Sequence, residues 1–102
     1  MAILTNQEAA DSLNYDSADQ MPSKVLSIFL PAVNEYLKSS TGKDWGALTT
    51  TYTAIDPVAK MTAVILLVRW FENPGEMGTA SGIGVIGMIA QLGAKYQQES
   101  QL

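Results

Sequence analysis

The sequence predicts a mainly α fold: a single domain formed by a small bundle of about four helices around one central buried helix. Apolar residues recur at three- and four-residue spacing in several segments, which is the period of a helix with one buried face. The segment 57–72 is apolar on nearly every side, as is typical of a helix enclosed by other elements. A chain of 102 residues is long enough for one domain with a modest core.

The first helix is predicted over residues 6–13. Thr5 and Glu8 have the spacing of a capping box, in which a hydroxyl and a carboxylate satisfy each other's backbone N–H groups. Residues 1–4 form an N-terminal lead, whose apolar side chains are expected to hold this helix against the rest of the domain. The acidic, turn-rich residues 14–20 are expected to form a loop. The residues expected to face inward are Ala9, Ala10 and Leu13.

The second helix is predicted from about Pro22 to the glycine at position 42, a natural residue for the end of a helix. Pro31 lies inside the apolar stripe, and an interior proline costs a helix about 3 kcal/mol. Because the apolar spacing continues in phase across Pro31, we expect a kink there rather than two helices joined at Leu30. The stripe consists of Val25, Ile28, Phe29, Ala32, Val33, Tyr36 and Leu37.

A linker and the central helix follow. Residues 43–55 contain a run of threonine and tyrosine, residues that favour extended chain, so a short strand-like or irregular linker is expected. Asp56 can cap the central helix and Pro57 suits its first turn. Asn73 precedes a proline, which disfavours the helical conformation and therefore ends this helix. The unbroken apolar run at 64–68 indicates that neighbours cover the helix on all sides, other copies of the chain among them.

The last part of the chain is rich in glycine. Residues 75–84 are predicted to form a flexible loop. A final helix is predicted from Val85 to about Gln98, in which each of Gly87 and Gly93 costs about 1 kcal/mol relative to alanine. A helix this weak needs docking to persist, and residues 97–102 are expected to fray.

Composition excludes several function classes. Charged residues make up only 16% of the chain and the net charge is −4, so binding to nucleic acid through clustered basic residues is not expected. The chain contains neither cysteine nor histidine, which excludes disulfides, thiolate metal sites and thiol nucleophiles and removes the commonest general base. We predict no catalytic, cofactor-binding or metal-binding residues. No signal peptide or membrane span is recognisable, so a soluble protein is expected.

Two sequence motifs partly resemble binding sites. Asp11, Asp16 and Asp19 lie close together in sequence but lack the alternating ligands and central glycine of a calcium loop. Gly82-x-Gly84-x-x-Gly87 matches the letters of a dinucleotide-binding fingerprint. That motif follows a predicted helix and loop rather than the first strand of a βαβ unit, so a hinge or mobile loop is the better interpretation.

The order of these elements resembles the head–tail connector, or DNA-packaging adaptor, family of long-tailed bacteriophages and prophages. A helix ending in a Tyr-Leu…Thr-Gly pattern is followed in that family by a Pro-Val-Lys…Trp-Phe-Glu-Asn helix, and the C-terminal apolar segment is similar to residues 85–92. This chain has Pro74 where the family often has arginine, and differs at residues 12–15. The matching positions are Tyr36, Leu37, Thr41, Gly42, Pro57, Val58, Lys60, Ala63, Val64, Ile65, Leu66, Leu67, Val68, Trp70, Phe71, Glu72 and Asn73.

The resemblance implies a structural virion protein, not an enzyme. Members of that family form a homo-oligomeric ring below the portal and join the capsid to the tail or to head-completion proteins after DNA is packaged. The implied location is the head–tail junction of the virion, and the host cytoplasm during assembly. DNA would pass through without specific binding, and the negative net charge suits a conduit that repels phosphate. No cofactor and no membrane are implied.

We predict that ring contacts use the end of the central helix, the glycine-rich loop and the face of the last helix. One alternative is a small helical, protein-binding regulator or antitoxin-like protein, which would form a symmetric dimer through residues 64–68. A helix-turn-helix DNA-binding protein is a third hypothesis, which the lack of a basic patch disfavours. The candidate contact residues are Trp70, Phe71, Glu76, Gly82, Ile83, Val85, Met88, Leu92 and Tyr96.

Overall fold

A computed structural model of the chain describes residues 3–46, 56–79 and 83–100, excluding the side chains of residues 83 and 98–100. The predicted fold class is confirmed: the described residues form a helical domain and contain no strand. The α-helices are α1 (Asn6–Ser12), α2 (Leu30–Thr41), α3 (Pro57–Glu72) and α4 (Ile83–Ser100). Shorter helical turns lie at Ala18–Gln20, Val25–Phe29 and Pro74–Glu76. The predicted extended linker lies mostly at residues 47–55, outside the described residues.

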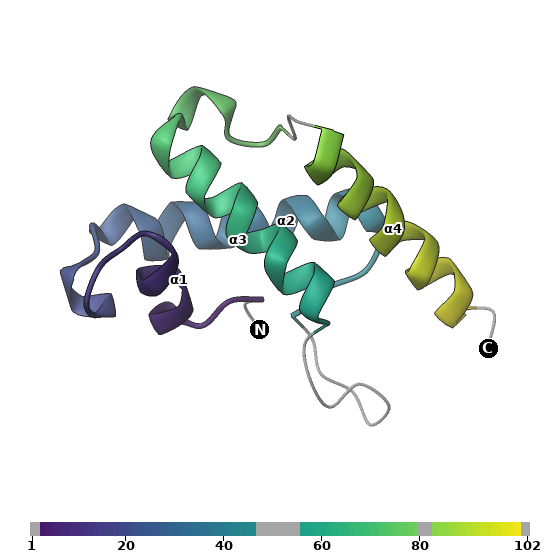
Figure 1. Cartoon of the computed structure of the whole chain (residues 1–102), viewed down its shortest axis with the longest axis horizontal. Coiled ribbons are helices and arrows are strands. Elements are labelled where there is room, and N and C mark those ends of the chain that lie inside the picture. The colour runs from purple at the N-terminus through teal and green to yellow at the C-terminus, as the bar shows by residue number, and fades with distance from the viewer. Residues whose placement is uncertain (1–2, 47–55, 80–82, 101–102) are drawn as a thin grey trace.

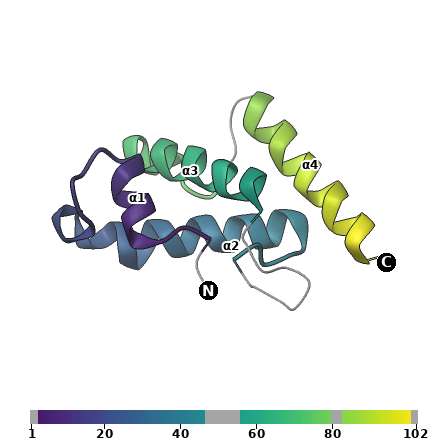
Figure 2. The ribbon, with the colours of Figure 1, turned by 60° about the horizontal axis from the view of Figure 1, so that its bottom comes forward.

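Helix α3 lies at the centre of the domain. It packs against α2, with α1 near one end of this pair and α4 along the other side (Figures 1 and 2). The domain is flat, with principal extents of 43 × 30 × 18 Å. In this arrangement α1, α2 and α4 each cover part of α3.

The predicted capping box at the start of α1 is confirmed. The Glu8 N–H donates to the Thr5 hydroxyl oxygen at 3.1 Å, and the Thr5 N–H donates to Glu8 Oε1 at 2.8 Å. The lead before the helix is buried at Ile3 and Leu4. The Ile3 N–H donates to the side chain of Asn34 on α2 at 3.2 Å, so the lead ties α1 to the body.

Pro31 is the second residue of α2, and the helical conformation continues without a break from the turn before it, through Phe29 and Leu30. The five residues Val25–Phe29 before it form a π-helical turn, in which the Leu30 N–H donates to the carbonyl of Val25. A wider turn gives the proline ring space beside the carbonyl groups of the preceding turn, with which it would clash in a regular α-helix. The predicted stripe is buried at Val25, Phe29, Val33 and Leu37, whereas Ile28 is exposed.

The ends of α3 follow the predicted signals. The carboxylate of Asp56 accepts hydrogen bonds from the backbone N–H groups of Val58 and Ala59, and the helix ends at Glu72 before Asn73. Its burial is uneven, however. The enclosed side includes Leu66 and Leu67, whereas Met61 on the opposite side is exposed. The chain's own helices supply this cover, so burial of α3 does not require a second copy.

Residues 73–79, which follow α3, are held by local hydrogen bonds. Pro74–Glu76 form a single 3₁₀ turn, and the N–H of Thr79 donates to the carbonyl of Glu76 at 3.0 Å. Helix α4 then begins at Ile83, two residues before the predicted start, and continues to Ser100. Residues 97–100, which the sequence predicts to fray, are therefore helical.

Candidate functional site

The residues that the sequence predicts for partner contacts do not share one exposed face. Trp70, Val85 and Leu92 are buried in the core of the single chain. The indole N–H of Trp70 donates to the carbonyl oxygen of Thr79 at 2.9 Å, and its ring meets Tyr36 edge-on at 5.4 Å. The single chain already buries these three side chains, because large apolar side chains gain by burial against their own chain as well as against a partner, and their part in partner contacts stays a prediction.

Phe71 lies in an aromatic group at one end of the domain. Its ring meets Phe29 at 5.9 Å and Tyr15 at 6.5 Å between centroids, in edge-to-face arrangements. The ammonium of Lys24 lies 5.8 Å from the centre of the same ring. Phe71 is half-buried, so it contributes to this group and keeps part of its ring at the surface.

Three other candidates are half-buried: Glu76, Met88 and Tyr96. Tyr96 packs beside the end of α2, where a Cβ added at Gly42 would lie 3.3 Å from the tyrosine ring. Gly42 also has a φ of +86°, a conformation that favours glycine, so both its backbone and its neighbour restrict substitution.

The outward face of α4 is uncharged at three exposed positions: Ile86, Gly87 and Ala90. Sequence reasoning selected the inner face of this helix instead, because that face carries the larger apolar side chains. Of the remaining candidates, Gly82 and the side chain of Ile83 lie outside the described residues.

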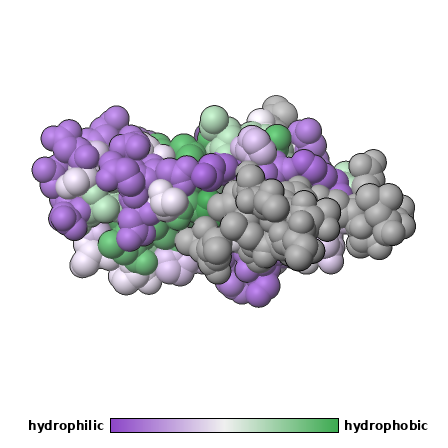
Figure 3. Space-filling model, turned by 90° about the horizontal axis from the view of Figure 1, so that it is seen from below, coloured by the Kyte–Doolittle hydropathy of each residue, from purple (hydrophilic) through white to green (hydrophobic). Residues whose placement is uncertain are grey.

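Large apolar side chains are exposed at separate places in the described part of the chain. The most exposed are Met61 on α3, at 55%, and Ile86 on α4, at 54%; Leu26 and Ile28 before α2 are exposed as well. Figure 3 shows one face of the molecule, on which hydrophobic residues gather toward the middle beside a hydrophilic end. None of these four residues is among the contact residues that the sequence predicts.

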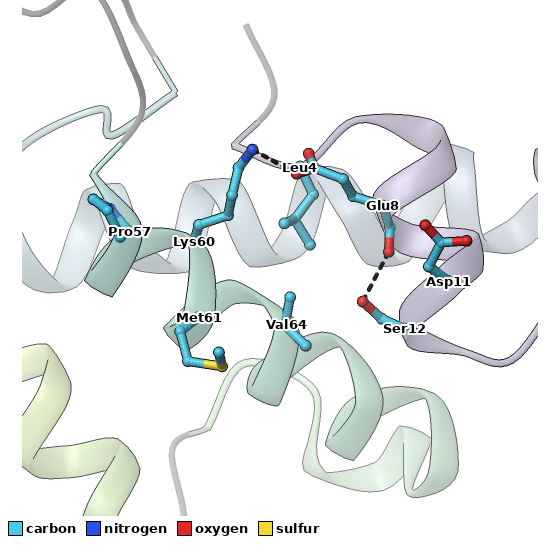
Figure 4. Close-up of a pocket in the computed structure, with 8 residues that line it drawn as sticks. All are labelled: Leu4, Glu8, Asp11, Ser12, Pro57, Lys60, Met61 and Val64. Carbon is cyan, nitrogen blue, oxygen red and sulfur yellow. Dashed lines mark hydrogen bonds and ion pairs between the residues drawn. The ribbon is translucent and has the colours of Figure 1, made fainter.

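A shallow pocket of about 330 Å³ lies between α1 and α3 (Figure 4). Lys60 of α3 reaches across to Glu8 of α1, with 2.5 Å between Nζ and Oε2, while Met61 and Val64 line the α3 side. Burial raises the pKa of Glu8, but its bonds to Lys60 and Thr5 outweigh burial and hold that pKa below its ordinary value. The pocket is lined by Leu4, Glu8, Asp11, Ser12, Pro57, Lys60, Met61 and Val64.

Asp56 joins the start of α3 to α4. Its buried carboxylate accepts the N–H of Val58 at 2.8 Å and of Ala59 at 3.3 Å, and it forms an ion pair with Lys95 of α4. Burial by itself raises the pKa of Asp56, but the Lys95 ammonium and the two backbone N–H groups hold that pKa below its ordinary value. The spacing of 39 residues between the partners explains why no local sequence signal showed this pair.

The lowered pKa of Asp56 predicts that the fold loses stability in acid. Ionised Asp56 contributes its full stabilisation above the unfolded-state pKa of about 3.9, and this is lost as the pH falls through the lower folded-state pKa. Urea unfolding followed from about pH 7 down to about pH 2.5 should show the free energy of unfolding declining below about pH 5. The variant Asp56→Asn should decline less over the same range. Equal declines in both proteins would contradict the prediction.

Within residues 3–46, 56–79 and 83–100, no group of three or more acidic side chains is placed to hold a metal ion. In the same part of the chain, no helix is long and apolar enough to cross a membrane. Comparison of the chain with family models, curated proteins and solved structures finds no match.

Proposed function

We propose that this protein is a structural subunit of a phage or prophage head–tail connector, which forms a ring between the portal of the DNA-filled head and the tail. The observation that carries the proposal is the position of the family-like segment. The residues that resemble the family's characteristic helix form one complete helix, α3, which begins after Asp56 and ends at Glu72. Helix α3 also packs against the other three α-helices. The resemblance therefore falls on the structural centre of the domain.

The distribution of apolar side chains supports self-association. Met61 on α3 and Ile86 on α4 leave more than half of their surface exposed. A ring requires that each subunit use two different surfaces, one for each neighbour. Exposed apolar residues on two different helices are compatible with such contacts.

The charge supports a role as a conduit. Ten acidic side chains outnumber six basic ones, giving a net charge of −4. A ring of such subunits carries a strong negative charge, and a negatively charged lumen repels the phosphates of passing DNA.

Mass photometry and negative-stain electron microscopy of the purified chain, alone and with the portal protein from the same genome, test the proposal. We expect closed rings, either in the protein alone at high concentration or on the portal. A chain that stays monomeric at high concentration with portal present would contradict the proposal. A symmetric dimer that does not bind the portal protein would favour the hypothesis of a protein-binding regulator. Salt-sensitive binding to duplex DNA would favour the hypothesis of a DNA-binding protein.

Two variants and a matched control test which exposed residues form the contact between subunits. Met61→Glu and Ile86→Glu place a charge at exposed positions, so we expect both to fold normally and to reduce ring formation. Asp19→Asn, at an exposed position in the helical turn Ala18–Gln20, is the control and should assemble as the unaltered chain does. Rings that form equally well in all three variants would exclude both exposed residues from the contact.

A further inference from the structure

Helix α4 is attached to the domain by one side only. Val85 and Leu92 are buried and Ile89 is partly buried against the core, whereas Gly87 and Ala90 on the other side are exposed. Figures 1 and 2 show α4 at the edge of the domain, beside the pair formed by α2 and α3.

The glycines of α4 weaken the helix without improving its packing within the chain. Gly84, Gly87 and Gly93 each replace a side chain that would favour the helix. A Cβ added at any of the three meets nothing within 4 Å. Close packing therefore does not require glycine at these positions, and α4 depends on its docking contacts to remain helical.

The ion pair between Lys95 and Asp56 is one of those contacts, and its two side chains differ in their exposure to solvent. The Lys95 side chain is 48% exposed, so its ammonium regains water easily when α4 moves away. The Asp56 carboxylate is buried and also caps α3 through Val58 and Ala59, so it keeps two partners after Lys95 leaves. The arrangement therefore allows α4 to separate while the start of α3 stays capped.

We propose that α4 opens from the rest of the domain as one cooperative unit, and that the Lys95–Asp56 ion pair is the latch that holds it closed. Elements with few buried side chains and weak intrinsic structure open at a free energy below that of global unfolding, and among the described side chains of α4 only Val85 and Leu92 are buried. Opening uncovers the sides of α2 and α3 that α4 covers in the closed domain. The proposal concerns the isolated subunit and does not depend on ring formation.

Native-state hydrogen exchange of the full chain, resolved by NMR or mass spectrometry, tests the proposal. We expect the α4 amides to share one opening equilibrium and to exchange at least about tenfold faster than the central amides of α3. Exchange of both helices at one common rate, through global unfolding, would overturn the proposal.

Two variants should shift the opening of α4 in opposite directions. Lys95→Met keeps most of the side-chain stem but removes the charge. The ion pair is lost when α4 opens and also when the whole chain unfolds, so we expect about tenfold faster exchange in α4, and faster exchange in α3 only at amides that exchange through global unfolding. Gly87→Ala favours the helix at a position with open space around it, so α4 should exchange about fivefold more slowly. Lys38→Met, at an exposed lysine of α2, is the charge control and should leave α4 unchanged. Unchanged exchange of α4 in Lys95→Met would contradict the latch, and unchanged exchange of α4 in Gly87→Ala would contradict the opening unit.

Discussion

Replacing Trp70 by alanine is expected to lower the free energy of unfolding by about 3–5 kcal/mol, the range for removing a large buried aromatic side chain. The Trp70 side chain is 1% exposed, packs edge-on against Tyr36 and donates its indole N–H to the Thr79 carbonyl. The substitution removes this buried ring together with both interactions and leaves a cavity beside α3. Since a domain of this size is stable by only about 5–15 kcal/mol, a substantial part of that stability should be lost. Urea unfolding followed by circular dichroism measures the change.

Met61→Ala is the matched control for Trp70→Ala, because it also shortens an apolar side chain of α3. Met61 is exposed, so we expect a change within about 0.5 kcal/mol. A loss of less than about 1 kcal/mol in Trp70→Ala would contradict the placement of Trp70 in the core.

Replacing Asp56 by alanine is expected to cost about 2–4 kcal/mol. Loss of the N-cap accounts for about 0.5–2 kcal/mol, and loss of a hydrogen bond to a charged partner for about 1.5–3 kcal/mol. The cost lies below the sum of the two upper limits because the Lys95 ammonium is half exposed and returns to water. The same urea unfolding measurement gives the change in free energy.

Comparison with Lys95→Met separates the two roles of Asp56. That variant removes the ion pair and leaves the cap of α3 in place, so it should cost less than Asp56→Ala. Asp19→Ala removes an exposed carboxylate and should change stability by no more than about 0.5 kcal/mol. Equal losses in Asp56→Ala and Lys95→Met would show that the cap contributes nothing.

Several helix boundaries could be predicted from the sequence, because short-range chemistry sets them. The capping box of Thr5 and Glu8 starts α1, Asp56 caps α3, and Gly42 ends α2 with a positive φ. Each signal acts through backbone groups within about one helical turn. Pro31 shows the limit of such reasoning: the predicted continuity of the helix is confirmed, but the π-helical turn that accommodates the proline was not foreseen.

The identity of the exposed residues could not be predicted in the same way. Helix α3 is apolar on nearly every side, so its sequence does not show that Leu66 is enclosed and Met61 exposed. On α4, the sequence predicts partner contacts for the large apolar residues Val85 and Leu92, and the single chain buries both of them. An apolar side chain favours burial equally against its own chain and against a partner, so the pattern alone cannot distinguish the two.

The sequence by itself determined the helical class and the caps at which α1, α2 and α3 begin or end. Only the tertiary structure decided which side of each helix is covered and which distant charges meet, as Lys60 meets Glu8 and Lys95 meets Asp56. The physical reason is the separation along the chain over which each interaction acts. Caps and helical periodicity depend on residues a few positions apart, whereas burial and these ion pairs depend on how separate helices pack in space.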